Sequence, residues 1–437
     1  MKKLIIVCLS LMIIIFGAAW LYAFLIRGKS YEINAVGEAE VTKFYIYGTT
    51  LAIEGLLNYE MSIEEEADVK LVFINSKEET FYDLLCHYEF GNLYFTTSSY
   101  LNEGINLEGL VPKNYQIFLS INGEYYALIN ESNYENVDYY TISNNNRTNY
   151  FNFLFKKTKI LLNGGYRTKE YMVLKWKKMK IPKDVYDVTI DPGHGGIDPG
   201  AGAMVNVKES EQVLEISKLL KMKLENLGLK VKLTREGDYI PGNRNTNDPY
   251  GKDGRVNVSY ETKSKFLLSV HLNSDYTLLD VGGVEIYTPN DVNYSFAYSL
   301  ASSIVEKANT KYSFKEPDKI MNGVYYRYLN NKDIIEGKKS ALNDGYEAYP
   351  IQSNTPYYFI LRETGGIMTK AYVDGRDSRV QENAYRNANF GAESYLLELG
   401  YLVYSKDLEN IKTNKGGYVD GISEALISHI TSLQVKK

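Results

Sequence analysis

The sequence predicts an α/β domain with a mostly parallel sheet over residues 185–437, preceded by a β-sandwich-like domain over 36–165 and an N-terminal transmembrane helix within 1–29. Three patterns indicate this order. An uncharged apolar run fills residues 4–26, short strand-like runs occupy the first half, and strand-like and helical runs alternate from Asp184 onward. Such alternation is typical of a parallel sheet with helices on both faces.

The composition is that of a folded protein with two or three domains. The 437 residues are 44% hydrophobic and 24% charged, close to globular averages, which excludes a disordered or collagenous chain. A net charge of -5 offers no basic excess to a phosphate backbone, so we expect no nucleic-acid partner. Cys8 and Cys86 are the only cysteines, and Cys8 lies in the apolar run. We therefore expect no intramolecular disulfide framework.

The apolar N-terminal run is long enough to cross a membrane. As a helix, Leu4 to Ile26 would span about 35 Å, whereas a bilayer has a hydrocarbon core of about 30 Å. This length favours an uncleaved anchor, with a cleaved signal peptide as the alternative. Lys2 and Lys3 favour a cytoplasmic N-terminus, and both interpretations export the rest of the chain.

Short runs rich in aromatic and β-branched residues predict the strands of the first domain. They are Phe44–Tyr47, Val69–Ile74, Leu93–Thr97, Tyr115–Ile121, Tyr125–Ile129, Tyr139–Ile142 and Tyr150–Phe155. Asn122 and Gly123 lie between two runs and predict a tight hairpin turn. Short strands at this spacing are typical of an antiparallel β-sandwich. The lysine-rich residues that follow predict a final strand and a linker, placed at 166–184.

Strands and helices alternate in the second domain. The predicted strands are Val185–Ile190, Lys230–Leu233, Phe266–Val270, Val284–Tyr287, Tyr357–Leu361 and Tyr395–Glu398. The predicted helices, from apolar residues at helical spacing, are Glu209–Leu227, Tyr294–Ala308 and Gly421–Leu433. Gly228 is the expected C-cap of the first of these helices. Because active groups in α/β folds lie where strands end, the residues after each strand are the candidates for chemistry.

Two histidines occupy such positions. His194 lies in a glycine-rich loop after Val185–Ile190, and His271 follows Phe266–Val270. Two neutral imidazoles and one carboxylate form the open set of three ligands that a catalytic zinc uses, with water in the fourth position. Glu209, at the start of the long helix, is the expected third ligand. Either histidine alone could equally be a hydrogen-bonded residue at a strand end.

Short motifs around these residues follow one another in a fixed order. They are Asp191-Pro192-Gly193-His194-Gly195-Gly196-Ile197-Asp198-Pro199-Gly200-Ala201, Lys208-Glu209-Ser210-Glu211, Thr234-Arg235, Ser269-Val270-His271-Leu272-Asn273-Ser274 and Leu397-Glu398-Leu399-Gly400-Tyr401. In this order they resemble the motifs of the zinc-dependent N-acetylmuramoyl-L-alanine amidases of bacterial cell walls. The resemblance covers about residues 185–433, and several spaced motifs are far more specific than a single short pattern.

The resemblance implies a substrate, a cofactor and a set of site residues. By it, His194, Glu209 and His271 are zinc ligands, and Glu398 is the catalytic acid/base. The implied reaction is hydrolysis of the amide bond between N-acetylmuramic acid and L-alanine in peptidoglycan, on the wall side of the cytoplasmic membrane. A catalytically silent wall-binding or scaffold protein on this fold, and a zinc peptidase that cuts within the stem peptide, are the alternatives.

Other polar residues near these motifs leave roles open. Three rival carboxylates are Glu211, Glu215 and Glu393, and Glu209 is preferred because it holds the family position after Lys208. Three further residues are candidates for supporting the site or for contacting substrate: Asn273, Arg235 and Arg362. The alternative for Glu398 is a structural role, as the ion-pair partner of Arg362 or of another buried cation.

The chain departs from the family pattern in two places. A Ser-Asn pair usually lies soon after the last motif, whereas Leu402 to Lys406 stand here. Residues 365–392 separate two segments that nearly adjoin in the family, and a long insertion beside an active site is commonly a lid or a substrate loop. Tyr239 to Arg255 form a second polar loop near the site.

Overall fold

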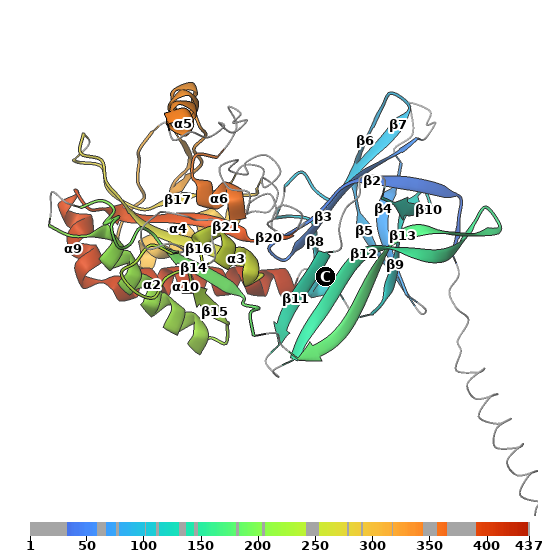
Figure 1. Ribbon diagram of the computed structural model, residues 1–437, viewed down its shortest axis with the longest axis horizontal. Coiled ribbons are helices and arrows are strands. Elements are labelled where there is room, and N and C mark those ends of the chain that lie inside the picture. Colours follow the sequence, from blue (N-terminus) through green and yellow to red (C-terminus); the bar gives the residue numbers. More distant parts are fainter. Residues whose placement is uncertain are drawn as a thin grey trace, which may run out of the picture.

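The computed structural model describes most of the chain as a β-rich domain and an α/β domain that contact each other (Figure 1). The described residues are 33–58, 67–75, 78–100, 102–110, 113–130, 137–143, 147–180, 183–202, 206–241, 253–277, 279–289, 292–316, 318–343, 356–364 and 390–435. The predicted anchor, Leu4 to Ile26, lies outside these ranges. Within them, every helix is too short or too polar to span a bilayer.

The first domain consists of strands in a single sheet. They are β1 Asn34–Ala35, β2 Gly37–Tyr47, β3 Thr50–Asn58, β4 Val69–Ile74, β5 Glu79–Asp83, β6 Leu85–Glu89, β7 Asn92–Thr96, β8 Ile105–Asn106, β9 Tyr115–Ile121, β10 Glu124–Ile129, β11 Val137–Ser143, β12 Arg147–Leu162 and β13 Gly165–Lys180. The runs predicted from sequence coincide with β2, β4, β7 and β9 to β12. Along its main path the sheet has the order β1-β12-β13-β9-β10-β2-β3-β7-β6.

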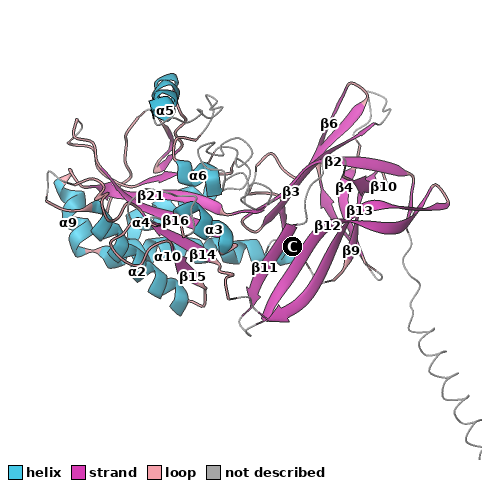
Figure 2. Cartoon of the chain, in the orientation of Figure 1, coloured by secondary structure: helices cyan, strands magenta, loops and turns pink. Residues whose placement is uncertain are grey.

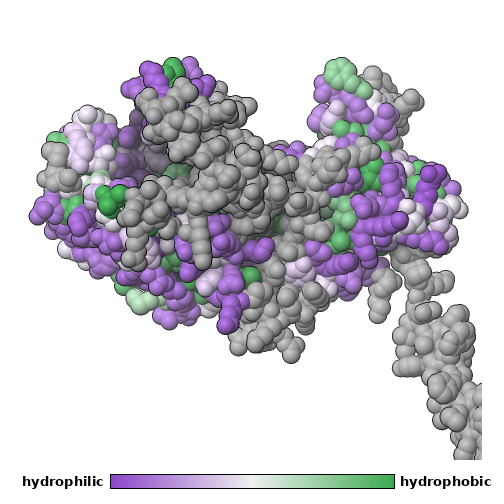
Figure 3. Space-filling model, in the orientation of Figure 1, coloured by the Kyte–Doolittle hydropathy of each residue, from purple (hydrophilic) through white to green (hydrophobic). Residues whose placement is uncertain are grey.

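The predicted sandwich of two separate sheets is wrong, because hydrogen bonds join all these strands. β9 is the junction: it pairs with β4, β10 and β13. Buried side chains from strands far apart along this sheet, such as Phe44, Phe73 and Phe153, meet in one core. The sheet therefore folds over its own apolar face. This fold buries a core, as a sandwich does, but the core lies within one continuous sheet. The face seen in Figure 3 is mainly hydrophilic.

The hairpin predicted at Asn122 and Gly123 is confirmed. Their φ angles are 51° and 84°, and they connect β9 to β10 with Ile121 opposite Glu124. Both angles lie in the left-handed region that asparagine and glycine tolerate.

The final strand predicted in the lysine-rich segment is confirmed, but it takes up most of 166–184, so the linker placed there is wrong over most of its length. Residues 165–180 form β13, which pairs with β12 along the whole strand. The lysines suggested a solvated connection, but Met172 and Leu174 on the same strand are buried in the domain core. A strand with one buried side can carry many lysines on its exposed positions, so charge density did not show where the strand ends and the linker begins.

The second domain has a mixed sheet of order β15-β14-β16-β21-β17-β19-β18. Its strands are β14 Val188–Pro192, β15 Val231–Leu233, β16 Phe266–Asn273, β17 Glu285–Tyr287, β18 Lys319–Met321, β19 Val324–Tyr325 and β21 Glu393–Tyr401. Neighbours from β15 to β21 are parallel, as expected, whereas β17 runs antiparallel to β21 and β18 antiparallel to β19. Its helices are α2 Glu209–Asn226, α3 Arg255–Glu261, α4 Ser295–Lys307, α5 Asn331–Asn343, α6 Phe359–Thr364, α9 Ser405–Thr413 and α10 Lys415–Val435.

Helices cover both faces of this sheet (Figure 2). On one face, α2, α4 and α10 pack on β14, β16 and β21 in the largest core of the molecule. On the other face, α3 and α6 pack on Leu267 of β16 and Leu396 of β21. The strand predicted at Tyr357–Leu361 is wrong, because Phe359–Thr364 is helix α6. Short apolar runs fit a buried helix as well as a strand, and here Ile360 and Leu361 are buried against the sheet.

The two domains share backbone and side-chain contacts. The short strand β20, Phe390–Gly391, pairs in parallel with Ile46 and Tyr47 of β2, just before β21 begins. Figure 1 shows β20 between the domains. The Asn102 side chain donates to the carbonyl of Asn293 and accepts from the amide of that residue. The β-rich domain is therefore docked on the α/β domain near the strand that carries Glu398.

A buried lysine lies at this domain contact. Lys265 is 6% exposed; its Nζ forms an ion pair with Glu108 of the first domain and lies 3.5 Å from Asp187 of the second. The change Lys265→Met should lower the free energy of unfolding by about 3–5 kcal/mol, because both carboxylates would stay buried without their shared cation. Urea denaturation measures this, with Lys70→Met, which breaks an exposed pair with Asp68, as the control. Equal effects of the two changes would contradict the expectation.

Candidate metal centre

The loop after β14 brings His194 towards His271. His194 has a φ of 58°, a left-handed conformation that is uncommon for residues other than glycine and concentrates at functional sites. A Cβ atom at Gly193 would lie 2.3 Å from Cε1 of His271, and one at Gly200 would lie 2.6 Å from Oε2 of Glu209. Glycine is required at both positions because side chains of the site fill the space.

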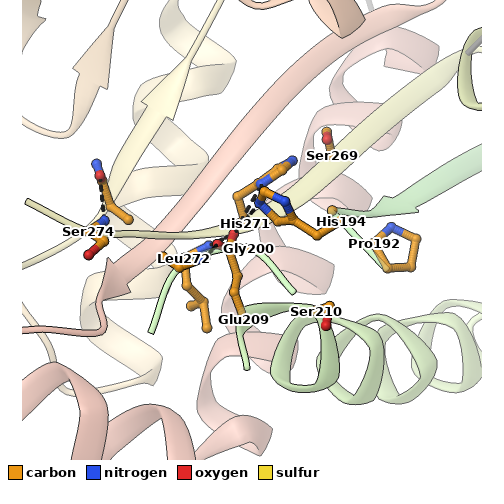
Figure 4. A network of polar contacts seen from close by, with 12 residues as sticks. Pro192, His194, Gly200, Glu209, Ser210, Ser269, His271, Leu272 and Ser274 are labelled. Carbon is orange, nitrogen blue, oxygen red and sulfur yellow. Dashed lines mark hydrogen bonds and ion pairs between the residues drawn. The ribbon is translucent and has the colours of Figure 1, made fainter. Parts of the chain in front are cut away.

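His194, Glu209 and His271 converge on one point (Figure 4). Their ligand atoms lie within 4.8 Å of one another. Oε1 of Glu209 is 3.1 Å from both Nε2 of His194 and Nδ1 of His271, and these two nitrogens are 3.2 Å apart. The rings meet edge to face, with an interplanar angle of 80°. This arrangement can hold one metal ion with three ligands, and it comes from the elements that the sequence indicated.

Hydrogen bonds fix the orientation of these side chains. Asp198 Oδ2 lies 2.8 Å from Nδ1 of His194, which leaves Nε2 facing the other two groups. Glu209 is buried, and its two oxygens accept the amide hydrogens of Leu272 and Ala201 at 2.9 and 2.8 Å. Such partners set the tautomer of a histidine and the direction of a carboxylate at metal sites.

The charges of this cluster favour ionised forms. Burial alone would raise the pKa of Glu209, but hydrogen bonds and charge interactions with the two histidines hold it well below its usual range. Burial alone would lower the pKa of His194, but Glu209 and Asp198 raise it above its usual value. Glu209 and Asp198 therefore stabilise positive charge at this point, whether it is a proton on an imidazole or a bound cation.

A buried ion pair supports the base of the His194 loop. Asp191 of β14 is buried and accepts three hydrogen bonds. They come from Arg255 Nη1 at 2.7 Å, from Thr234 Oγ1 at 2.6 Å and from Ser269 Oγ at 2.9 Å. Arg255 also donates to the carbonyl oxygens of Pro192 and His194. Burial opposes ionisation of Asp191, yet Arg255 and Thr234 hold its pKa below the usual value.

The sequence did not assign roles to Asp191 or Arg255. Asp191 belongs to the first quoted motif and directly follows buried residues, which is a signal for a strand-end function. Arg255 follows a polar loop, and no local pattern marks it. Arg235, a candidate for supporting the site, is buried and donates to the carbonyls of Pro192, Gly193 and Ser210. It therefore holds the loop and the start of α2 rather than facing a substrate.

Glu398 lies beside the three converging groups, on the next strand. In the β16–β21 pairing it is the register partner of His271, so both side chains project from the same face of the sheet. It is buried, and its Oε2 has no hydrogen-bond partner within the described residues. Burial and the negative charges of Glu209 and Glu285 raise the pKa of Glu398 well above its usual range. A carboxyl group whose protonated form is favoured in this way can serve as an acid as well as a base.

The rival carboxylates lie away from the converging groups. Glu211 pairs with Lys208 and Glu215 with Lys415, both on the exposed side of α2. Glu393 accepts from Tyr395 and lies 3.3 Å from His429.

The two remaining candidates for contact with substrate form hydrogen bonds with nearby groups of the protein. Asn273 donates to Glu285 at 2.9 Å, and Arg362 donates to the carbonyl of Tyr357 at 2.9 Å. Most of the expected lid region, residues 365–389, and most of the polar loop after Tyr239 fall outside the described residues.

A cavity of about 130 Å³ opens beside the histidines. Its polar wall includes His194, His271 and Arg255, and its apolar wall includes Ile360 and Leu396. The site therefore has space next to the proposed metal position, between the sheet and α6.

Comparisons with known proteins find a family to which part of the chain is similar. Residues 188–336 match the family described as N-acetylmuramoyl-L-alanine amidase. Over 123 residues, the chain is 31% identical to the N-acetylmuramoyl-L-alanine amidase AmiA of Escherichia coli (strain K12) and 30% identical to AmiA of Salmonella typhimurium. In both cases the match covers 28% of this chain and 38% of the relative. The chain thus spans well under half of the length of these relatives.

Two solved structures to which this chain is similar are named as N-acetylmuramoyl-L-alanine amidases. The catalytic domain of the amidase CwlV from Bacillus (Paenibacillus) polymyxa var. colistinus is 19% identical, with a TM-score of 0.37, over 56% of this chain and 99% of its own. The amidase AmiC2 of Nostoc punctiforme is 20% identical, with a TM-score of 0.34, over 57% of this chain and 99% of its own.

The family match and the geometry concern the same part of the molecule. The matched residues begin at β14 and include His194, Glu209 and His271, the groups that converge in the structure. Residues 188–336 of this chain therefore match the N-acetylmuramoyl-L-alanine amidase family over the segment that holds the converging groups.

Proposed function

We propose that this protein is a zinc-dependent amidase that hydrolyses the bond between N-acetylmuramic acid and L-alanine in peptidoglycan. The observation that carries the proposal is the convergence of His194, Glu209 and His271 inside a domain of the amidase family. Two imidazoles and one carboxylate are the ligand set of catalytic zinc sites that keep a fourth position open.

The residues around this point suit amide hydrolysis. Zinc held there would act as a Lewis acid on the carbonyl oxygen and lower the pKa of an attacking water to about 7. Glu398 accepts the proton of that water and delivers it to the departing nitrogen of L-alanine. Its raised pKa favours the protonated state in which Glu398 would hold the proton between the two halves of this transfer. Asp198 keeps Nδ1 of His194 occupied, so that Nε2 is free for the metal.

Two other functions would use the same fold differently. A silent wall-binding protein would bind peptidoglycan without forming products, and a zinc peptidase would cut within the stem peptide. The buried Glu398 beside the three converging groups favours an active enzyme over a silent one, since a buried, unpartnered carboxyl oxygen costs stability. The match to the amidase family supports cleavage of the bond to L-alanine rather than cleavage of bonds within the stem peptide.

Digestion of purified peptidoglycan by the full-length protein, solubilised in detergent, tests the proposal. Mass spectrometry should find intact stem peptides with a free L-alanine amino group, together with glycan strands that carry free lactyl carboxylates. Fragments cut within the stem would identify the peptidase, and binding without products would identify the silent protein. Metal analysis of the same preparation should find about one zinc ion per chain.

The orientation of His194 should affect the affinity for zinc. In the Asp198→Asn variant the partner of Nδ1 loses its charge, so we expect zinc affinity to fall by about 10- to 100-fold. Competition with a chromogenic chelator measures this change. Asp238→Asn is the matched control, because Asp238 accepts from Gly196 in the same loop but contacts none of the three proposed ligands. Similar zinc affinities for the two variants would contradict this role of Asp198.

We propose that residues 4–26 anchor the protein in the cytoplasmic membrane, with the catalytic domain facing the cell wall. The length of this uncharged run and the lysines before it support the proposal. Protease added to wall-stripped cells should digest the body of the protein and leave the N-terminal residues in the membrane. Full protection of the body would place the domain away from its proposed substrate.

A further inference from the structure

The β12–β13 hairpin has a tight turn at the end of the β-rich domain that lies away from the α/β domain (Figure 1). Leu162 pairs with Gly165, so Asn163 and Gly164 alone make the turn, with φ angles of 51° and 73°. Each strand has 16 residues, which corresponds to a length of about 50 Å along the strand. Because β13 ends at Lys180, just before the α/β domain begins, the hairpin separates its own turn from that domain.

Basic side chains surround the outer part of this hairpin. Residues 156–175 include six basic residues and one acidic residue, whereas the whole chain has a net charge of -5. The six basic residues are all exposed: Lys156, Lys157, Lys159, Arg167, Lys169 and Lys175. Lys169 forms an ion pair with Glu38 at 2.8 Å, but Lys157, Lys159 and Arg167 form no ion pair with any described residue. Their charge is therefore available to an anionic partner.

Tyr166 adds an exposed aromatic ring beside the turn. It is 55% exposed, and Nζ of Lys159 lies 3.9 Å from the centre of its ring. Tyrosine rings are enriched at the boundary between a membrane and water, where one side of the ring meets acyl chains and the other meets headgroups. Clusters of lysine and arginine close to a membrane bind anionic headgroups. The end of the hairpin combines both features.

The first described strand holds this turn in place. β1 pairs with β12 directly beside it. The amide of Gly164 donates to Oδ1 of Asn34 at 2.9 Å, and the amide of Asn163 donates to the carbonyl of Ala35 at 2.8 Å. The proposed anchor ends at Ile26, eight residues before Asn34. Eight residues of chain reach at most about 28 Å, so an anchored protein keeps this turn close to the membrane surface.

We propose that the basic residues at the end of the β12–β13 hairpin bind anionic lipid headgroups of the membrane that holds the anchor. This inference rests on the anchor proposed at residues 4–26. The lysine and arginine side chains contact lipid phosphates, and Tyr166 enters the headgroup region. Two points of attachment restrict the rotation of a domain more than one does, so this contact fixes the orientation of the β-rich domain. The hairpin then holds the α/β domain away from the membrane, towards the wall.

Full-length protein in lipid nanodiscs tests the proposal. Cys8→Ser and Cys86→Ser remove the native thiols, and Thr168→Cys places the fluorophore NBD at an exposed position of β13 near Tyr166. Discs of phosphatidylcholine alone are compared with discs that contain about 30% phosphatidylglycerol. NBD fluorescence should be at least about two-fold higher in the anionic discs, because headgroups exclude water from the label. Spin-labelled lipid in the same discs should quench it.

Removing three of the cations together tests whether they cause this contact. The variant with Lys157→Gln, Lys159→Gln and Arg167→Gln should show the same NBD fluorescence in anionic and in neutral discs, since most of the attraction to lipid phosphate is lost. These side chains are exposed and form no ion pair with a described residue. The thermal midpoint of this variant should therefore equal that of the parent.

The matched control removes the same charge from the α/β domain. It combines Lys218→Gln, Lys406→Gln and Lys412→Gln, at exposed positions of α2 and α9, and it should respond to anionic discs as the parent does. Equal fluorescence of the parent in both discs, or an equal loss in the control and the hairpin variant, would overturn the proposal. A rise with soluble polyphosphate but not with anionic discs would assign the cations to a dissolved polymer and would also overturn it.

The anchor and the hairpin are read out separately in this experiment. Retention of the protein with discs of both compositions during gel filtration reports on the anchor, because that attachment does not depend on lipid charge. The difference in NBD fluorescence between the two discs reports on the hairpin. Loss of the protein from both discs would therefore refute the anchor, whereas retention without a difference in fluorescence would refute only the hairpin contact.

Discussion

The His271→Ala variant should purify without the zinc ion that we expect in the parent protein, and its amidase activity should fall to background. His271 provides one of three ligand atoms that lie within 4.8 Å of one another, and two remaining ligands cannot hold a catalytic zinc tightly. His194→Ala should behave in the same way. Metal analysis by mass spectrometry, on protein purified without added zinc, measures the content per chain.

Two controls show whether the loss of zinc is specific to the proposed ligands. His87→Ala removes a histidine from β6 that stacks on Tyr94, in the other domain, so this variant should keep its zinc and its activity. Circular dichroism should show that all variants remain folded. Parental zinc content in both His194→Ala and His271→Ala would mean that the metal lies elsewhere or is held by other residues.

Glu398→Gln should lower kcat by about 10²- to 10⁴-fold without loss of zinc, because the amide keeps the shape of the side chain but cannot accept the proton. Glu398 is not among the three converging ligand atoms, so metal content separates its role from theirs. Single-turnover assays on defined muropeptides measure the chemical step. KM should change much less than kcat if the loss lies in the transition state.

The control for this change is Glu211→Gln. Glu211 lies on the same helix as Glu209 but pairs with Lys208 on the exposed side, so its removal should leave the rate within about two-fold of the parent. A Glu398→Gln enzyme of nearly parental rate would assign proton transfer to another group. Loss of zinc in this variant would instead make Glu398 part of the metal site.

The sequence could predict that His194, Glu209 and His271 would lie close together, because these residues lie in local patterns. His194 and His271 each stand at or near the end of a buried apolar run, and Glu209 begins a helix whose period is clear. Parallel strands bring their carboxyl ends to one edge of a sheet, so these positions had to be close. Glu398 was found through a motif, and its pairing with His271 explains why that motif belongs to the same site.

Contacts between distant segments could not be predicted in this way. Glu285 stands in a strand of three residues, and its partners come from four places in the chain. Arg255 is marked by no motif, although it joins Asp191 and the His194 loop. The pairing of β20 with β2 joins residues about 340 positions apart in sequence, a contact that periodicity cannot reveal.

The hydrogen bond between the carbonyl of Thr364 and the amide of Ala392, at 3.0 Å, has a consequence for chain length. The hydroxyls of Thr364 and Ser394 also lie 2.6 Å apart. These two contacts hold the residue where the chain leaves α6 next to the residues where it enters the sheet. The entropic cost of closing a longer connection there grows by only about 0.6 kcal/mol per doubling of length. This point is therefore a permissive insertion site, where segments of different length can be exchanged without altering the sheet that carries Glu398.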